Sequence, residues 1–197
     1  TKTLVDVLKK QSRKDIQDLM HLSDNLAELN YERYQGFFEQ DEKMALLAFT
    51  GDVYKGLDAQ SLKDDALVYA GSHIGILSGL FGLLRGSDVM RPYRLEMGTS
   101  LSVNGGKHLY DFWGDKIASA INKEMENTGA SHLVNLASNE YYKAVNKKVI
   151  AAPIIDIDFK EIKGNQPPKT IGIYAKKARG MVARYMVENE VKQPDAL

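Results

Sequence analysis

The chain has 197 residues, of which 44% are hydrophobic, and its 26 Lys and Arg residues balance 26 Asp and Glu residues, so the formal net charge is zero. This length suits a single compact domain over residues 1–197. Zero net charge argues against a protein that grips nucleic acid by bulk charge. The absence of cysteine excludes disulfides and thiolate metal sites, and it fits a reducing cytoplasm. No apolar run approaches the ~20 residues that span a bilayer, so we expect no membrane partner.

Charge is unevenly distributed along the chain. Residues 1–70 carry nine Lys and Arg against thirteen Asp and Glu, whereas the remaining residues carry seventeen against thirteen. The later part of the chain therefore has a modest positive excess, which permits a basic patch without requiring one.

The first forty residues have the apolar spacing of helices. Leu4, Val5 and Leu8 lie at helical intervals, and a similar period continues over residues 16–29. The string at 23–25, Ser-Asp-Asn, is typical of a helix N-cap. We therefore expect residues 13–38 to form two helices joined by a tight turn, or one helix with a break, and residues 1–40 could form a helical lobe.

Short apolar runs alternate with helical patterns in the rest of the chain. The run at 44–49 fits a strand or a helix by periodicity alone, and its length and flanking glycine favour a strand. Further strands are predicted at 74–78, 133–136, 149–159 and 170–174, and helices at 61–70, 107–127, from Ser138 onward, and 177–190, with a turn at 164–168. Alternating strands and helices predict an α/β fold, or a mixed α+β fold, with short buried strands flanked by helices.

Four motifs follow the predicted strands, at residues 51–56, 78–79, 137–138 and 175–177. Open α/β sheets bind ligands beyond the carboxyl ends of their strands, so these motifs would converge on one cleft if the strands are neighbours. Arg binds phosphate bidentately and Lys adds a point charge, which predicts a phosphate-bearing ligand. The predicted DNA- or phosphate-binding residues are Lys55, Arg85, Arg94, Lys143, Lys176, Lys177, Arg179 and Arg184. The predicted cleft-lining residues are Gly51, Asp52, Tyr54, Tyr93, Glu96, Ser138 and Glu140.

Each of these residues also has a plain structural interpretation. Any single basic side chain can be a solvated surface charge, and Glu96 beside Arg94, or Glu140 beside Lys143, can form an ion pair. The string at 51–56 lacks the ending of a P-loop and the spacing of a dinucleotide fingerprint, so a turn with positive φ is the better interpretation. A close approach of its backbone to a ligand stays open.

Aromatic and histidine residues offer fewer specific signals. Trp113 and Phe112 could stack on a base, but core packing is favoured for both, and the tyrosines at 54, 93 and 174 are better ligand candidates. The histidines at 21, 73, 108 and 132 show no metal-binding spacing, so we assign no metal site and no cofactor. Nothing in the sequence identifies a catalytic residue.

The helical hairpin over 13–38 is the segment whose length best suits contact with a DNA backbone, through main-chain N–H groups that point at phosphates. Its turn contains Asp24 and lacks the glycines of such hairpins, and the carboxylate would repel a phosphate. An ordinary packed helical hairpin is the alternative.

Several strings in the same order resemble the YaaA family of bacterial peroxide-stress proteins. They are RPYRLEMGT at 91–99, SGLFGLLR at 78–85, FWGD at 112–115, NLASNEY at 135–141 and YAKKARG at 174–180. The resemblance covers nearly the whole chain. The motif positions that it carries over are Gly51, Asp52, Tyr54, Gly56, Gly79, Gly82, Arg94, Glu96, Gly98, Trp113, Gly114, Asn135, Ser138, Glu140, Tyr141, Lys143, Lys176, Lys177 and Arg179.

The resemblance implies a cytoplasmic bacterial protein that helps cells survive hydrogen peroxide. It also implies a link to lowering unincorporated iron, and DNA binding through a positively charged cleft and a helix-hairpin-helix-like element. We therefore expect a DNA-binding stress protein that contacts duplex phosphates mostly without sequence specificity. The alternative is an enzyme that acts on a nucleotide or nucleobase-like small molecule in the same cleft.

The chain departs from the family pattern in three places. Family members usually open with a short strand and a Ser-Pro-Ala-Lys-type loop, and they continue past the last helix into a tail with Phe and Gly. We expect the native protein to contain both, because the chain starts with Thr1 and shows neither. The string Arg-Gly-Ser-Asp at 85–88 replaces the commoner Arg-Pro turn, with a small loss of rigidity.

Overall fold

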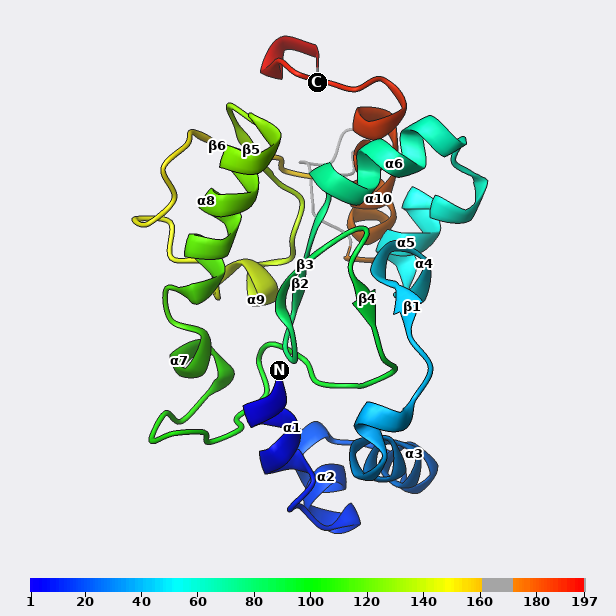
Figure 1. The fold of residues 1–197 in the computed structure, drawn as a ribbon, viewed down its shortest axis with the longest axis vertical. Helices are drawn as coiled ribbons and strands as arrows, with labels where there is room; N and C mark the ends of the chain where they lie inside the picture. Colours follow the sequence, from blue (N-terminus) through cyan, green and yellow to red (C-terminus); the bar gives the residue numbers. More distant parts are fainter. Residues whose placement is uncertain (161–171, 197) are drawn as a thin grey trace, which may run out of the picture.

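The computed structural model describes residues 1–160 and 172–196, which form a mixed α/β fold in which helices predominate (Figure 1). This confirms the expected fold class. The α-helices are α1 (Lys2–Leu8), α2 (Arg13–Met20), α3 (Asp24–Gln35), α4 (Ala45–Ala48), α5 (Asp52–Leu57), α6 (Asp64–His73), α7 (Leu109–Trp113), α8 (Lys116–Thr128), α9 (Asn139–Tyr142) and α10 (Gly172–Glu188). The 3-10 helices are η1 (Phe37–Glu39), η2 (Ala59–Ser61) and η3 (Pro194–Ala196).

The strands of the described residues form three separate pairs. The pairs are β1 (Lys43–Met44) with β4 (Val89–Met90), antiparallel; β2 (Gly75–Ser78) with β3 (Gly82–Arg85), antiparallel; and β5 (Leu133–Asn135) with β6 (Ile154–Asp156), parallel. The strands at 74–78 and 133–136 were therefore located correctly. They belong to different pairs, so the predicted strand-end motifs do not share one sheet edge.

The N-terminal helices lie at one end of the molecule and share a core with its middle (Figure 1). Ser12 caps α2 in a reciprocal capping box with Asp15, and His21 ends the helix in a left-handed conformation. The expected two helices within 13–38 are confirmed, with the break at 21–23. A mixed cluster holds this end in place: Leu4, Val5, Leu8, Ile16, Tyr34 and Phe37 pack with Leu80, Met97, Leu109 and Ile117.

A second buried cluster lies around the β2–β3 pair. It consists of Ala45, Leu46, Leu57, Ala59, Leu62, Ala70, Ile76, Leu84, Met90 and Val187. Phe81 and Tyr93 pack against both clusters and connect them. The buried Trp113 holds the turn between β2 and β3, because its indole N–H donates to the Gly79 carbonyl at 3.0 Å. The core placement that was favoured for Trp113 is thus confirmed.

Several predicted elements were wrong in type or extent. The run at 44–49 is not a strand: β1 ends at Met44, and the good helix formers Ala45–Ala48 make one helical turn. The predicted 149–159 strand is only Ile154–Asp156, and the 107–127 helix is divided at Gly114, whose φ is +47°. The 61–70 helix begins later, at Asp64.

The last predicted strand, at 170–174, was also wrong where the structure describes it. Gly172 begins α10, because the following Ala, Lys and Arg residues favour helix over strand. Residues 170 and 171 and the turn predicted at 164–168 lie outside the described residues.

Two glycines let α5 and α10 cross with their backbones in contact. A Cβ on Gly180 would collide with the carbonyl oxygen of Val53, and a Cβ on Gly56 would collide with that of Lys177. This crossing joins segments that are more than a hundred residues apart in the chain. It also sets the position of every side chain on the first turns of α10.

We expect Gly180→Ala to lower the free energy of unfolding by about 1–3 kcal/mol or more, because the new methyl group forces the two helices apart. Denaturant titration followed by circular dichroism measures the loss. The matched control is Gly172→Ala in the same helix, where an added Cβ meets no described atom within 4 Å and the change should be neutral or slightly stabilising. Equal stabilities for the two variants would contradict the close crossing.

Candidate functional site

Four of the predicted phosphate-binding residues lie on the two helices of the α5–α10 crossing. Lys176, Lys177 and Arg179 lie on the first turns of α10, and the Lys177 backbone rests against Gly56, next to Lys55. The two α10 lysines are exposed, and the Arg179 guanidinium lies 5.8 Å from the centre of the Phe159 ring. We call these four residues the α10 basic cluster. Its α10 members were expected just after a strand, but they lie inside a helix.

The turn before α5 has the conformation expected from its sequence. Gly51 has a φ of +118° and begins the helix, so the predicted positive-φ turn is confirmed. Asp52, in the first helical turn, forms an ion pair with Lys55 at 3.3 Å. The Lys55 side chain remains 74% exposed, which leaves it accessible from solvent.

A pocket of about 770 Å³ lies beside this crossing. Its walls come from α5, α6, the β2–β3 pair, the end of α8, β5 and α10, and most of the lining side chains are apolar. Among the predicted site residues, those that line it are Tyr54, Arg85, Ser138, Lys176 and Arg179. The predicted residues outside its lining are Gly51, Asp52, Lys55, Tyr93, Arg94, Glu96, Glu140, Lys143, Lys177 and Arg184.

Tyrosines lie at and behind one pocket wall, with Tyr54 and Tyr141 in the lining and Tyr93 outside it. Tyr54 stacks on Phe49 with ring centres 5.3 Å apart, and Tyr93 meets Phe49 edge-on. The Tyr93 hydroxyl shares a 2.6 Å hydrogen bond with the fully buried Ser78 hydroxyl. Desolvation raises the pKa of Tyr54 and of Tyr93, and it raises the pKa of Tyr141 to about 12 with help from the Glu140 and Glu96 carboxylates.

The Arg94 segment is held by contacts within the chain. Arg94 pairs with Glu96 at 2.8 Å, as expected, while its carbonyl accepts a hydrogen bond from Tyr34. Its Nε is buried and has no hydrogen-bond partner among the described residues. None of these contacts involves the α10 basic cluster.

The expected ion pair between Glu140 and Lys143 is replaced by other contacts. The Glu140 carboxylate accepts the Gly98 N–H at 3.0 Å, and its carbonyl accepts from the Tyr110 hydroxyl. The Lys143 ammonium lies 4.9 Å from the centre of the Tyr110 ring. A cation near an aromatic face gains about 0.5–1 kcal/mol at an exposed site, so this contact competes with an exposed ion pair of similar strength.

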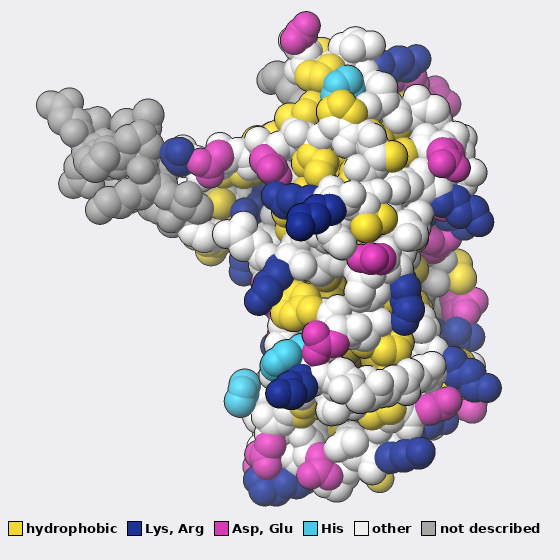
Figure 2. Space-filling view, turned by 90° about the vertical axis from the view of Figure 1, so that its left-hand side faces the viewer, with side chains coloured by type: hydrophobic (Ala, Val, Ile, Leu, Met, Phe, Trp, Pro, Cys, Tyr) yellow, Lys and Arg dark blue, Asp and Glu magenta, His cyan; other side chains and the backbone are white. Residues whose placement is uncertain are grey.

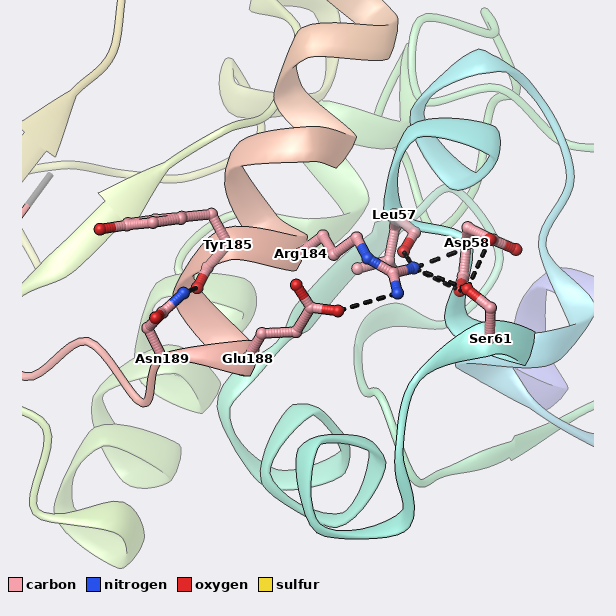
Figure 3. Close-up of polar contacts among 7 residues, drawn as sticks. All are labelled: Leu57, Asp58, Ser61, Arg184, Tyr185, Glu188 and Asn189. Carbon is pink, nitrogen blue, oxygen red and sulfur yellow. Dashed lines mark hydrogen bonds and ion pairs between the residues drawn. The ribbon is translucent and has the colours of Figure 1, made fainter.

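Arg184 is engaged in a structural contact (Figure 3). One guanidinium nitrogen donates to the carbonyls of Leu57 and Asp58 and to the Ser61 hydroxyl, and the other pairs with Glu188 at 2.8 Å. The carbonyls belong to the C-terminal end of α5, where orphan acceptors attract cations. The guanidinium therefore ties α10 to α5.

The remaining basic residues do not form one continuous surface. Arg85 is bound through two nitrogens to Asp88, at 2.7 and 2.9 Å. On the face shown in Figure 2, Lys and Arg side chains are interspersed with Asp and Glu and with apolar areas. In residues 1–160 and 172–196, no three His, Asp or Glu side chains gather as metal ligands. No described helix has the length and apolarity needed to cross a bilayer.

Asn135 and Tyr142 are two polar lining residues outside the predicted site set, although Asn135 is among the motif positions carried over from the family. Asn135 lines the pocket, donates to Asp156 at 2.7 Å and accepts the Ala137 N–H, which shapes the turn before Ser138. The buried Tyr142 hydroxyl, also at the lining, has no partner among the described residues. The family motif at 135–141 already marked Asn135, whereas the burial of Tyr142 has no local signal in the sequence.

The shifted phenols predict a loss of stability in alkali. Tyr141 has an ordinary pKa of 10.0 and a folded-state pKa of about 12, so its contribution is complete below pH 10 and is lost as the pH rises through 12. We expect the free energy of unfolding to fall over this range, and to fall less steeply in Tyr141→Phe. Urea titrations at several pH values measure both slopes, and identical slopes would contradict the enclosure of Tyr141.

Arg184 provides a test between a structural and a phosphate-binding role. We expect Arg184→Gln to lower the free energy of unfolding by about 1 kcal/mol, because the partly buried Leu57 carbonyl and the exposed acceptors beside it lose their charged donor. The matched control is Lys177→Gln, an exposed charge on the same helix, which should change stability by at most about 0.5 kcal/mol. Chemical denaturation compares them. A stable Arg184→Gln variant with weaker DNA binding would instead assign the guanidinium to phosphate.

Comparison with known proteins identifies the same family that the sequence motifs resemble. The family model described as "Peroxide stress protein YaaA" matches residues 1–197. A UPF0246 protein of Hahella chejuensis is 50% identical over 198 residues, which cover 98% of this chain and 77% of the relative. Relatives from Burkholderia cenocepacia (50% identical; 98% and 76%) and Saccharophagus degradans (47% identical; 98% and 77%) have the same UPF0246 designation. The chain therefore belongs to the YaaA family of peroxide-stress proteins.

Proposed function

We propose that this peroxide-stress family protein binds duplex DNA in the cytoplasm, mostly without sequence specificity, and contacts phosphates with the α10 basic cluster. The observation that supports the proposal most directly is that Lys55 on α5 and Lys176, Lys177 and Arg179 on α10 lie on two helices whose backbones touch. A rigid helix pair keeps the spacing of these charges fixed. Phosphate contacts of this kind position a protein on DNA and carry no direct sequence information.

The number of free cations limits how strongly this surface can bind. Arg85, Arg94 and Arg184 already have carboxylate partners within the chain, and Lys55 has a longer, exposed ion pair with Asp52 at 3.3 Å. The four residues of the basic cluster can make about four phosphate contacts. Each contact steepens the slope of log K against log salt concentration by about 0.9. We therefore expect a salt slope of about 3–4, which is well below that of strongly basic DNA-binding proteins. This estimate is compatible with the zero net charge of the chain.

The same contacts offer a physical link to iron and oxidative damage. Neutralising a phosphate with Lys or Arg releases the cations condensed around it. Ferrous ions associated with DNA would be among the cations displaced, and hydrogen peroxide would then be reduced farther from the bases. In this proposal, the protein limits free iron at DNA by competing for phosphates.

The second candidate function is an enzyme acting on a nucleotide or nucleobase-like ligand. It is favoured by the pocket volume of about 770 Å³, within the range of small-molecule sites, and by Lys176, Arg179 and Tyr54 at its lining. An anionic group would meet the two cations while a base stacks on the tyrosine. Such a ligand would saturate the site and produce no salt slope on DNA.

We expect the combined replacement of Lys176, Lys177 and Arg179 by Ala to abolish most duplex binding. Each lost phosphate contact should lower the salt slope by about one unit, so the slope should fall by about three. The fold should persist, because exposed charges contribute little to stability. Fluorescence anisotropy of a labelled duplex across a salt series measures affinity and slope, and circular dichroism checks folding.

The matched control replaces three exposed lysines elsewhere, Lys2, Lys10 and Lys63, and changes the net charge equally. It should retain the parent slope. Equal weakening in both triple variants would mean that bulk charge, rather than the α10 basic cluster, controls binding. A nucleotide that raises the melting temperature of the parent, without any DNA binding, would favour the enzyme instead.

A further inference from the structure

The chain has seven methionines and no cysteine, so thioethers are its only sulfur atoms. All seven methionines lie within the described residues. Six of them are buried or partly buried: Met20, Met44, Met90, Met97, Met125 and Met186. Met181 is the exception, because 56% of its surface is accessible to solvent. The fold therefore exposes one sulfur-containing side chain and shields the other six.

The crossing of α5 and α10 determines which way Met181 points. Gly180 faces the backbone of α5, and Val187 belongs to the second core cluster. Tyr174, Met181 and Tyr185 are spaced by seven and then four residues, so they share one face of the helix, and all three are exposed. The contact that fixes α10 therefore also holds Met181 on its solvent face.

Met181 also lines a second hollow in the surface, separate from the large pocket. This hollow has a volume of about 370 Å³, and its described lining residues are Ile157, Met181, Val182 and Tyr185. None of these four side chains carries a charge. Hydrogen peroxide is neutral and only slightly larger than water, so it enters such a hollow as water does. A peroxide molecule can therefore reach the thioether without a change in the fold.

We propose that Met181 is the site at which hydrogen peroxide modifies this protein, by converting the thioether to a sulfoxide. A lone pair of the sulfur attacks one peroxide oxygen, and the S–O bond forms as the O–O bond breaks. The proton on the transferred oxygen passes to the departing hydroxide, which leaves as water. The sulfur is oxidised to the sulfoxide level while the peroxide is reduced to water, so the step is balanced without a further reactant.

The exposure of Met181 allows the fold to tolerate the added oxygen. A sulfoxide is polar, and at an exposed site water donates the hydrogen bonds that it accepts. The same oxygen on the fully buried Met97 would lie in an apolar core without a donor, which is destabilising. An exposed sulfoxide is also accessible to a methionine sulfoxide reductase, which uses thiols to restore the thioether and releases the oxygen as water. Oxidation at Met181 is thus reversible, and each cycle consumes peroxide.

The test treats the 197-residue chain with hydrogen peroxide in the presence of a metal chelator, which suppresses hydroxyl-radical chemistry. Peptide mass spectrometry then locates each added oxygen atom. We expect Met181 to be oxidised more than about tenfold faster than Met97, because a core sulfur reacts only when the structure opens. In urea, where the fold is lost, all seven methionines should react at similar rates. Circular dichroism of the chain oxidised only at Met181 should match that of the parent.

Two conservative variants separate Met181 from the other methionines. Met181→Leu keeps an apolar side chain of similar size and should remove the fast phase of oxygen uptake, whereas the matched control Met125→Leu, at a partly buried position, should retain it. A methionine sulfoxide reductase with a dithiol should return the oxidised chain to its parent mass. None of these measurements contains DNA, so the outcome is independent of the proposed function.

Three results would overturn the proposal. They are oxidation of the folded chain at Met181 no faster than at the six shielded methionines, unfolding on the first oxidation, and a sulfoxide at Met181 that the reductase does not remove.

Discussion

The close crossing of α5 and α10 is the constraint on which the rest of the described structure depends. Gly56 and Gly180 carry no side chains, and only this absence allows two helix backbones to touch. Arg184 secures the same junction by donating to the carbonyls at the end of α5, and Val187 extends it into the second core cluster. The junction thus combines steric fit, hydrogen bonding and apolar burial. Moving α10 would displace both the basic cluster and one wall of the pocket.

Contacts within the chain explain why basic residues that share one predicted role differ in how accessible they are to a phosphate. Arg85, Arg94 and Arg184 face carboxylates or carbonyls of the same fold, and their donors are already engaged. Lys176 and Lys177 are exposed at the start of a rigid helix. A phosphate can bind the lysines without breaking an internal contact. The proposed DNA surface is therefore small, and electrostatic attraction should be sensitive to salt.

The pocket and the basic cluster share α10 but differ in physical character. The cluster is cationic and open, whereas most of the pocket wall is apolar and includes edges of β2 and β5 that pair with no strand among the described residues. Tyr54 lies between them and has an aromatic face together with a desolvated hydroxyl.

Local sequence was sufficient for features that depend on neighbours in the chain. It predicted the helices within residues 13–38, the positive φ of Gly51, the strand at 74–78 and the family, because caps, glycine conformation and motif order are local properties. The run at 44–49 and Gly172–Tyr174 were wrong because short apolar segments have no decisive period. Tertiary structure alone decided which cations remain free, which strand edges stay unpaired and where two glycines meet. Those outcomes depend on contacts between segments far apart in the chain, and no local pattern encodes their geometry.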